Sequence, residues 1–233
     1  MNLPAESSRQ SDVSVSFREW LVARQTGAKG RRKGERTRDR IRLATVDLLN
    51  ESGYRELRVA DVCDRAEITA PVLYRYFESK QALVEDVLRE FLAQFSLQRS
   101  RQPATNVFES ILDANLRWLQ WSRANSGLIQ CLLDFSSEIQ EFADLFAKAN
   151  NEWHLRTAHS IMRRFPPANT SIDEMHLTVI ALGGMMDDIT RRFFSMPDEH
   201  VSGLVAKVAP TDENLARFLT EIWCRAIYGS AWK

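Results

Sequence analysis

Residues 57–83 read LRVADVCDRAEITAPVLYRYFESKQAL and hold two short apolar segments separated by a turn. The first covers about residues 59–66, and Thr69 is a favourable N-cap for the second. Pro71 falls in the first turn of the second segment, where its missing N–H costs nothing. We therefore predict helices over about 59–66 and 70–77, joined by a tight turn at Glu67 and Ile68. A helix-turn-helix of this kind can place its second helix in the major groove of DNA.

Helical periodicity continues on both sides of this segment. Apolar residues from Ile41 to Leu49 recur at helical spacing, and Gly53 is expected to end that helix. Ser79 is expected to cap a helix that starts at Lys80 and continues to about residue 100. Beyond Pro103 the pattern predicts four or five more helices. They are one from 107 to about 127, a short one at 128–133, one over 138–165, one opened by the capping box of Ser171 and Glu174 and ended before Pro197, and a last one from the Thr211 cap to Gly229. The predicted fold is all-α, with nine or ten helices.

Composition excludes several classes of protein. With 44% hydrophobic and 27% charged residues in 233, the chain is neither wholly disordered nor collagen-like, and three distant cysteines make no disulfide scaffold. The first residues contain no apolar signal segment, and no apolar stretch approaches the ~20 residues of a membrane span. We expect a cytoplasmic protein with reduced thiols and no contact with a membrane.

Charge is unevenly distributed although the formal net charge is zero. Residues 1–80 carry a net charge of +4 and residues 81–233 a net charge of −4. From Arg24 to Arg42 there are nine basic and two acidic residues. This asymmetry indicates a basic module that binds nucleic acid, joined to an acidic body; the alternative is a solvated run of charge.

The residue types of the second short helix are suited to contacts with DNA bases and phosphates. Small side chains stand at its start, two tyrosine hydroxyls can reach phosphates, and Arg75 can pair with a phosphate or with guanine. Lys80, at the start of the next helix, is expected to act on a phosphate together with the helix dipole. The candidate DNA contacts are Arg36, Thr37, Arg40, Arg58, Thr69, Ala70, Pro71, Val72, Tyr74, Arg75, Tyr76 and Lys80.

The pattern Leu-Tyr-x-Tyr-Phe-x-x-Lys-x-x-Leu over residues 73–83 resembles the DNA-binding domain of TetR-family transcriptional regulators. The resemblance implies a helix-turn-helix domain over residues 36–82 and a body over residues 83–233 that binds an effector and dimerises. It also implies that Leu73 and Phe77 pack inside the domain. Two positions depart from the family pattern: Arg58 replaces a small Thr or Ser, and Glu67 replaces a turn glycine. Glu67 must therefore accept a positive φ, or the turn is altered.

Residues 1–35 are polar and basic and are expected to form a flexible arm. Residues 29–36, directly before the helix-turn-helix domain, are positioned to enter a minor groove; the alternative is a solvated tail. Phe17, Trp20 and Leu21 could form one amphipathic turn that docks on the domain.

Aromatic and methionine residues in the body could line a pocket for a lipophilic or aromatic effector, although ordinary core packing explains each of them as well. The candidate ligand contacts are Trp118, Trp121, Phe135, Phe142, Phe146, Trp153, Met162 and Met186. The resemblance places dimerisation on the last two long helices; the first of these contains two adjacent glycines, which cost ~2 kcal/mol unless a close approach offsets it. The candidate interface residues are Leu182, Gly183, Phe193, Phe218, Ile222 and Trp223.

Signatures of catalysis and of metal binding are missing from the sequence. His154 and His159 are five residues apart rather than four, and Asp187 and Asp188 have no ligand partner at a suitable spacing. We expect no metal and no cofactor. The sequence predicts a homodimeric regulator that binds double-stranded operator DNA, most simply a repressor released by a small effector. The alternatives are a DNA-binding regulator with no effector and an all-α enzyme.

Overall fold

The structure is a computed structural model that describes residues 16–27, 32–97, 106–136 and 139–229, and every regular element within these ranges is a helix. The all-α prediction is confirmed. The helices are α1 (Phe17–Thr26), α2 (Lys33–Glu56), α3 (Val59–Arg65), α4 (Ala70–Tyr74), α5 (Lys80–Leu97), α6 (Val107–Ala124), α7 (Ser126–Ser136), α8 (Gln140–Arg164), α9 (Ile172–Thr190), the π-helix η1 (Arg191–Ser195), α10 (Glu199–Val208) and α11 (Asp212–Tyr228).

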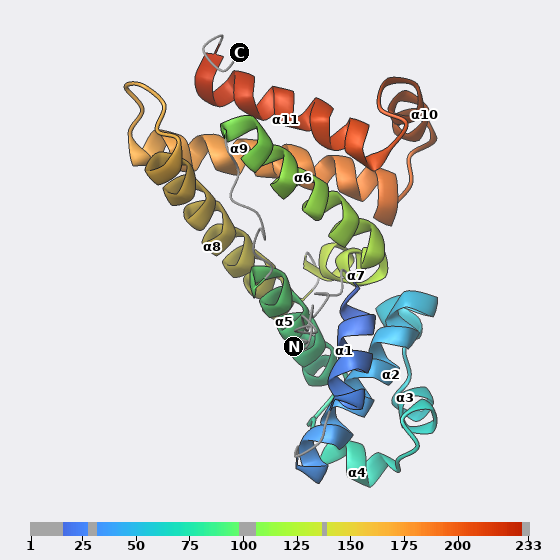
Figure 1. The fold of residues 1–233 in the computed structure, drawn as a ribbon. Helices are drawn as coiled ribbons and strands as arrows, with labels where there is room; N and C mark the ends of the chain where they lie inside the picture. The colour runs from blue at the N-terminus through green and yellow to red at the C-terminus, as the bar shows by residue number, and fades with distance from the viewer. Residues whose placement is uncertain (1–15, 28–31, 98–105, 137–138, 230–233) are drawn as a thin grey trace, which may run out of the picture.

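Figure 1 shows these helices in two groups. The head, α2 to α4, lies at the lower end with α1 packed along α2, while α6, α9 and α11 cross the upper end. α8 runs diagonally from beside α5 to the start of α9, and α7 lies between the two groups. This arrangement places α4 at the end of the molecule farthest from α11.

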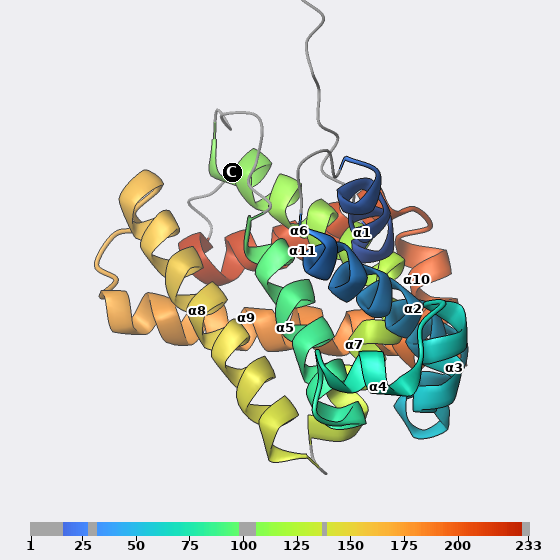
Figure 2. The same cartoon turned by 90° about the horizontal axis from the view of Figure 1, so that it is seen from below.

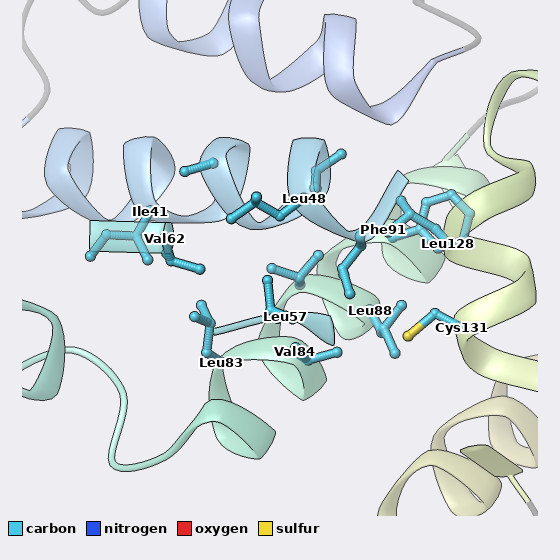
Figure 3. Close-up of a cluster of buried hydrophobic side chains, with 14 of the residues drawn as sticks. Ile41, Leu48, Leu57, Val62, Leu83, Val84, Leu88, Phe91, Leu128 and Cys131 are labelled. Atoms are coloured by element: carbon cyan, nitrogen blue, oxygen red, sulfur yellow. The ribbon is translucent and has the colours of Figure 1, made fainter. Parts of the chain in front are cut away.

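Two clusters of buried apolar side chains hold the groups together. The first includes Leu57 and Val62 of the head, Leu88 of α5, and Leu128 and Cys131 of α7, which Figure 3 shows converging on one space. The second joins α6, α8, α9 and α11. The domain boundary expected after residue 82 therefore falls in the first turn of α5, whose next residues already pack in the head. The head has no separate core, because α5 and α7 complete it.

α1 corrects the expectation of a flexible arm over residues 1–35. Phe17 and Leu21 of this helix are fully buried, and the Phe17 backbone N–H donates a hydrogen bond to Asn125 Oδ1 at 2.9 Å. The apolar spacing in the sequence was compatible with one docked turn, but only the surface offered by α2, α5 and α6 makes a ten-residue helix favourable. Residues 1–15 and 28–31, with the rest of the expected arm, lie outside the described residues.

Ion pairs bind α1 and α2 to α5. Arg24 contacts Asp39 at 3.1 Å and Glu90 at 2.8 Å, and Arg42 contacts Asp86 at 2.7 Å. Asp39 is 1% exposed and Arg42 is 7% exposed, so these charges are shielded from solvent. Breaking one partner of such a buried pair is costly, because the other charge is left uncompensated.

Helix ends follow the predicted capping in most places. Gly53 has φ of 74° and kinks the end of α2, the Ser171 and Glu174 capping box opens α9, and Thr211 caps α11. Gly127 does not end a helix: the break comes at Asn125, and Gly127 lies inside α7 against Asn50 of α2. α10 was not predicted. None of its residues is fully buried, although Val201, Leu204, Val205 and Val208 recur at helical spacing.

Replacing Phe17 by alanine tests the docking of α1. Because the ring is 3% exposed and stacks on Trp20 at 5.5 Å, we expect Phe17→Ala to lower the free energy of unfolding by about 3 kcal/mol. The control is Arg18→Ala, which removes an ion pair at the surface and should cost less than ~1 kcal/mol. Urea unfolding of both variants measures this. Equal midpoints for Phe17→Ala and the parent would show that α1 does not contribute to stability.

Candidate nucleic-acid interface

The predicted helix-turn-helix is present as α3 and α4. The turn closes through a hydrogen bond from the Ile68 backbone N–H to the Cys63 carbonyl at 3.0 Å. Glu67 has φ of 51°, so this residue adopts the left-handed conformation in which the family usually has glycine. A non-glycine residue there costs about 1–2 kcal/mol. The packing of Leu73, which is fully buried, holds the turn in place.

α4 is shorter than predicted, because it ends at Tyr74 rather than near Phe77. Leu73 and Phe77 are 0% and 4% exposed, which confirms that both pack inside the domain. Leu73 and Phe77 are four residues apart, and the Phe77 backbone N–H still donates to the Leu73 carbonyl at 3.1 Å, so the final turn keeps both side chains on the buried face. Arg75 therefore lies at the C-cap of α4, and Tyr76 lies beyond it in a half-buried position.

The outer surface of α4 carries most of the residues expected to read DNA. Ala70, Pro71 and Arg75 are exposed, and the Tyr74 side chain is 52% exposed. Thr69 occupies the N-cap position, as predicted, but its hydroxyl makes no capping hydrogen bond and is available to another acceptor or donor. Figure 2 views the molecule from this end, with α4 facing the viewer. The face is therefore accessible to a large partner.

Exposed arginines surround this face. Arg36 and Arg40 on α2, Arg58 before α3 and Arg75 are exposed, and they form no ion pair with the described residues. By contrast, Arg38 pairs with Asp86 at 2.7 Å. The basic run at the start of the chain is thus divided between arginines that hold the fold and arginines that leave positive charge on the surface. An unpaired cluster of this kind attracts polyanions.

Thr37 and Val72 are half-buried parts of the same region. The Thr37 hydroxyl donates to the Lys33 carbonyl at 3.1 Å within α2, and Val72 adds apolar surface to α4 beside Ala70.

Lys80 differs from its predicted role. Its ammonium group donates hydrogen bonds to the carbonyls of Tyr54 and Leu57, both at 3.1 Å, and lies 4.3 Å from the centre of the Tyr54 ring. Gly53 kinks the end of α2, where the Tyr54 carbonyl also accepts the Leu57 backbone N–H at 3.2 Å, and the Lys80 ammonium group adds a charged donor to both carbonyls. Lys80 therefore fixes the end of α2 against α5 rather than pointing from the surface.

The aromatic residues predicted for the effector lie in different surroundings. Trp121 stacks face to face on Phe91 at 4.5 Å, and Phe142 meets the Tyr54 ring edge-on at 5.9 Å, so both are core residues of the first cluster. Phe146 packs at the edge of that cluster, Met186 and Met162 belong to the second, and the Phe135 side chain lies outside the described residues.

Trp118 and Trp153 remain as the best candidates to meet a ligand. Trp118 touches both apolar clusters, and its ring lies 6.4 Å from that of Trp153, which is in turn 6.5 Å from that of Trp223. Beside them, His154 is 7% exposed, and burial, with the nearby His176, lowers its pKa.

A hollow of about 510 Å³ lies where the end of α2 meets α7. Asn50, Tyr54, Gln130 and Asp134 are among its lining residues, and none of the aromatic residues predicted for the effector lines it. Its polar wall does not match a lipophilic ligand.

The candidate interface residues are divided by the structure. Leu182, Gly183 and Trp223 are buried within the single chain, where Gly183 gives His154 the room that a Cβ would take. Phe193 is half-buried against Phe194, and Ile222 is half-buried on α11. Phe218 is 43% exposed, and only this member of the set has a largely solvent-facing side chain.

Sequence reasoning missed the outer face of α9. Leu177 is 68% exposed and Ile180 is 38% exposed, and Ala181 and Gly184 are exposed beside them. These positions follow i, i+3, i+4 and i+7, so they form one apolar stripe. The same spacing was present in the sequence, but the opposite stripe, with Val179 and Leu182, is equally apolar and could not be distinguished from it.

The described residues were also searched for a metal site and for a membrane-spanning helix. They contain no group of three His, Cys, Asp or Glu side chains placed to hold a metal ion. None of the helices in the described part of the chain has the length and apolarity that crossing a membrane requires.

Asp187 gives a testable pH dependence. Burial raises the pKa of its carboxyl group to about 6, from 3.8 in the unfolded chain. The folded protein therefore binds this proton more tightly, and the free energy of unfolding falls as the pH rises from about 4 to about 6. We expect Asp187→Asn to be more stable than the parent at pH 7.5, by up to about 3 kcal/mol, and no more stable at pH 4.

Thermal unfolding across this pH range checks that expectation, with Asp188→Asn as the control. A hydrogen bond from Arg191 lowers the pKa of Asp188, so its removal should destabilise the protein above pH 4 rather than stabilise it. Parallel pH profiles for Asp187→Asn and the parent would contradict the burial of this charge.

Comparison with known proteins agrees with this geometry. Residues 41–87 match the family model of bacterial regulatory proteins of the tetR family. No curated protein matches the chain in sequence. Among solved structures, Salmonella enterica GusR has a TM-score of 0.64 at 13% identity, with 82% of this chain and 95% of that chain covered.

Two further solved structures carry the family name. A tetR-family transcriptional regulator from Streptomyces coelicolor has a TM-score of 0.63 at 14% identity, covering 82% of this chain and 80% of that one. One from a Rhodococcus species has a TM-score of 0.63 at 17% identity, covering 82% and 98%. The helix-turn-helix region of the chain thus matches the tetR family in sequence over residues 41–87, and the described chain shares the fold of solved tetR-family regulators.

Proposed function

We propose that this protein is a homodimeric, sequence-specific DNA-binding repressor that a small lipophilic or aromatic effector releases from its operator. The observation that carries the DNA-binding part is the exposed face of α4 among arginines that have no acidic partner in the described residues. Its place of action is then the cytoplasm, with the chromosome. No step of this function requires a cofactor or an enzymatic reaction.

In this proposal α4 enters the major groove, which is ~12 Å wide and admits one helix. Ala70 and Val72 offer apolar surface suited to thymine methyl groups, and Arg75 can take guanine or a phosphate. The Tyr74 hydroxyl and the free Thr69 hydroxyl contact the backbone. With few hydrogen-bonding groups on α4, the shape and deformability of the site carry part of the specificity.

The remaining cations set the affinity. Arg36, Arg40 and Arg58 contact phosphates beside the groove, and Thr37 and Tyr76 help to seat the backbone. Each phosphate contact releases counterions, so binding weakens steeply with salt. Lys80 is left out of this group, because its ammonium group binds backbone carbonyls within the head.

Dimerisation is proposed through the outer stripe of α9 together with Phe218 and Ile222 of α11. Two symmetric copies present two α4 helices to the two halves of an operator. Exposed apolar side chains at helical spacing are costly in a monomer and stabilising in such a contact.

Effector release is proposed to act through α5. Trp118 touches both apolar clusters, Trp121 beside it stacks on Phe91 of α5, and α5 is paired with α2 through Arg42 and Asp86. A ligand that binds one arrangement of these helices more tightly shifts the spacing of the two heads. A coupling of ~1–3 kcal/mol weakens DNA binding 5–150-fold.

DNA binding is tested by selecting operators from random sequence and titrating them by fluorescence anisotropy. We expect a palindromic site with half-sites one helical turn apart, or a multiple of this. Tyr74→Ala should weaken binding at least about tenfold, and Arg36→Ala should reduce the slope of log K against log salt by about one. Arg163→Ala, on the exposed side of α8, is the matched control and should change neither value. Selection of no preferred sequence would contradict the proposal.

The dimer is tested by placing a charge on the outer stripe. Leu177→Glu should convert the dimer to a monomer in sedimentation velocity, because a carboxylate would be buried there without a partner. Leu155→Glu, on a 42% exposed position of α8, is the control and should remain dimeric. An unchanged dimer in Leu177→Glu would place the interface elsewhere.

A further inference from the structure

α1 lies outside residues 41–87, which match the family model, and it takes no part in the proposed contacts with DNA. Figure 1 shows this helix running from beside α7 along α2. α1 is antiparallel to α2, because Arg18 pairs with Asp47 and Arg24 pairs with Asp39. A helix of ten residues is a rod about 15 Å long, so α1 can hold two separate parts of the fold at a fixed distance.

The first turn of α1 is attached to the body. The Phe17 backbone N–H donates to Asn125 Oδ1 at 2.9 Å, and Asn125 is 3% exposed at the junction of α6 and α7. The first N–H groups of a helix have no partner within it, so Asn125 caps α1 from 108 residues away. The Phe17 ring also meets Phe91 of α5 edge-on at 5.6 Å, and Phe91 stacks on Trp121 of α6. α1 therefore begins in contact with the two helices that connect the head to the body.

The last turn of α1 is attached to α2 and α5. Arg24 Nε lies 3.1 Å from Asp39 of α2, and Arg24 Nη1 lies 2.8 Å from Glu90 of α5. Arg42 contacts the same two carboxylates, each at 3.4 Å. The Arg24 guanidinium group also lies 4.8 Å from the centre of the Trp20 ring, which holds its side chain against α1. Arg24 thus joins three helices at one point.

These two attachments oppose a rotation of the head on the body. α2 and α7 approach most closely at Gly127, where a Cβ would lie 2.4 Å from Asn50 Oδ1, so this contact is the natural pivot. A rotation about it would carry Asp39 with the head and leave Asn125 with the body. Because α1 is bound to both residues, the rotation must break the hydrogen bond at its first turn or the ion pairs at its last turn.

We propose that α1 is a brace that fixes the orientation of the head on the body and thereby restricts the dimer to one spacing of operator half-sites, with Arg24 as the positioning residue that couples the brace to α5. This inference rests on the proposed function, because half-site spacing has a meaning only for a dimer on DNA. It goes beyond that function by assigning the choice of spacing to a residue outside the DNA-binding face.

The first test measures how strictly the full-length protein keeps the half-site spacing. The selected operator is remade with one base pair inserted at its centre, which moves one half-site by about 3.4 Å along the DNA axis and about 35° around it. The spacing penalty is the Kd for the altered operator divided by the Kd for the selected one. We expect this penalty to be at least about fivefold smaller in Arg24→Gln than in the parent, because the released head can follow the displaced half-site.

Arg18→Gln is the matched control, because it makes the same chemical change on the same helix. Within the described residues Arg18 pairs with Asp47 of α2, so it links α1 to the head and not to α5. Its spacing penalty should stay within about twofold of the parent's. Partial unfolding weakens binding to both operators alike and leaves their ratio unchanged, so the penalty reports positioning rather than stability. Equal penalties in Arg24→Gln and the parent, or a parent that binds both operators equally well, overturn the inference.

Phe17→Leu loosens the other end of the brace. Leucine keeps an apolar side chain in the buried site but lacks the ring that meets Phe91 edge-on, so the variant should remain folded. We expect its spacing penalty to fall in the same direction as that of Arg24→Gln. A penalty equal to the parent's in Phe17→Leu contradicts the attachment of the brace at this end.

A distance measurement without DNA separates this inference from the proposed function. Asp61→Cys on α3 and Glu213→Cys on α11 supply two exposed sites for nitroxide labels, and the native cysteines are buried. Subunit exchange with excess unlabelled protein leaves the distance within one chain, which double electron–electron resonance measures. We expect a narrow distribution in the parent and in Arg18→Gln, and a broader one in Arg24→Gln.

The combined outcomes distinguish the two proposals. Equal widths in Arg24→Gln and the parent overturn the brace, whatever the protein does with DNA. Broadening in Arg24→Gln, in a protein for which no operator can be selected, supports the brace and contradicts the proposed function.

Discussion

The face-to-face contact between Phe91 and Trp121 is the constraint on which the rest of the structure depends. These rings lie 4.5 Å apart at an interplanar angle of 8°, and both are almost fully buried. Phe91 belongs to α5, which completes the core of the head, and Trp121 belongs to α6, which enters the body. Because interiors pack at crystal-like density, α5 cannot tilt without displacing α6 or breaking this contact. The position of α4 is therefore set in part by the body.

The arginines of the basic run fall into two groups, those that hold the helices of the head to α5 and those that leave positive charge on the surface. Arg24 and Arg42 hold α1 and α2 to α5, and their loss would remove two ion pairs from the buried carboxylate of Asp39. Arg36 and Arg40 come from the same basic run and pair with no acidic side chain within the described ranges. A single run of sequence thus supplies both the ion pairs that fix the head and the positive surface proposed to meet DNA. In the body, two neighbouring carboxylates differ in the same way: Asp188 pairs with Arg191, whereas Asp187 has no ion pair with the residues that the structure describes.

Much of the head could be predicted from sequence, because its signals are local. The N-cap position of Thr69, the kink at Gly53 and the positive φ of Glu67 depend on residues a few positions away, as do the caps at Ser171 and Thr211 in the body. Features that depend on distant partners could not be predicted. Docking of α1 needs Asn125, 108 residues away, and the inward turn of Lys80 needs the carbonyls of Tyr54 and Leu57 at the end of α2. The two apolar stripes of α9 differ only in burial, because the rest of the fold covers one of them and leaves the other exposed.

Native-state hydrogen exchange tests the central claim, that the head has no core apart from the body. Amide exchange of α2 and α7 would be followed at increasing denaturant concentrations below the unfolding transition. Because Leu57, Leu88 and Leu128 share one cluster, we predict that the most protected amides of α2 and α7 exchange through the same opening, with equal free energy and equal denaturant dependence. Exchange of α2 through a lower-energy opening that leaves α7 protected would contradict the account.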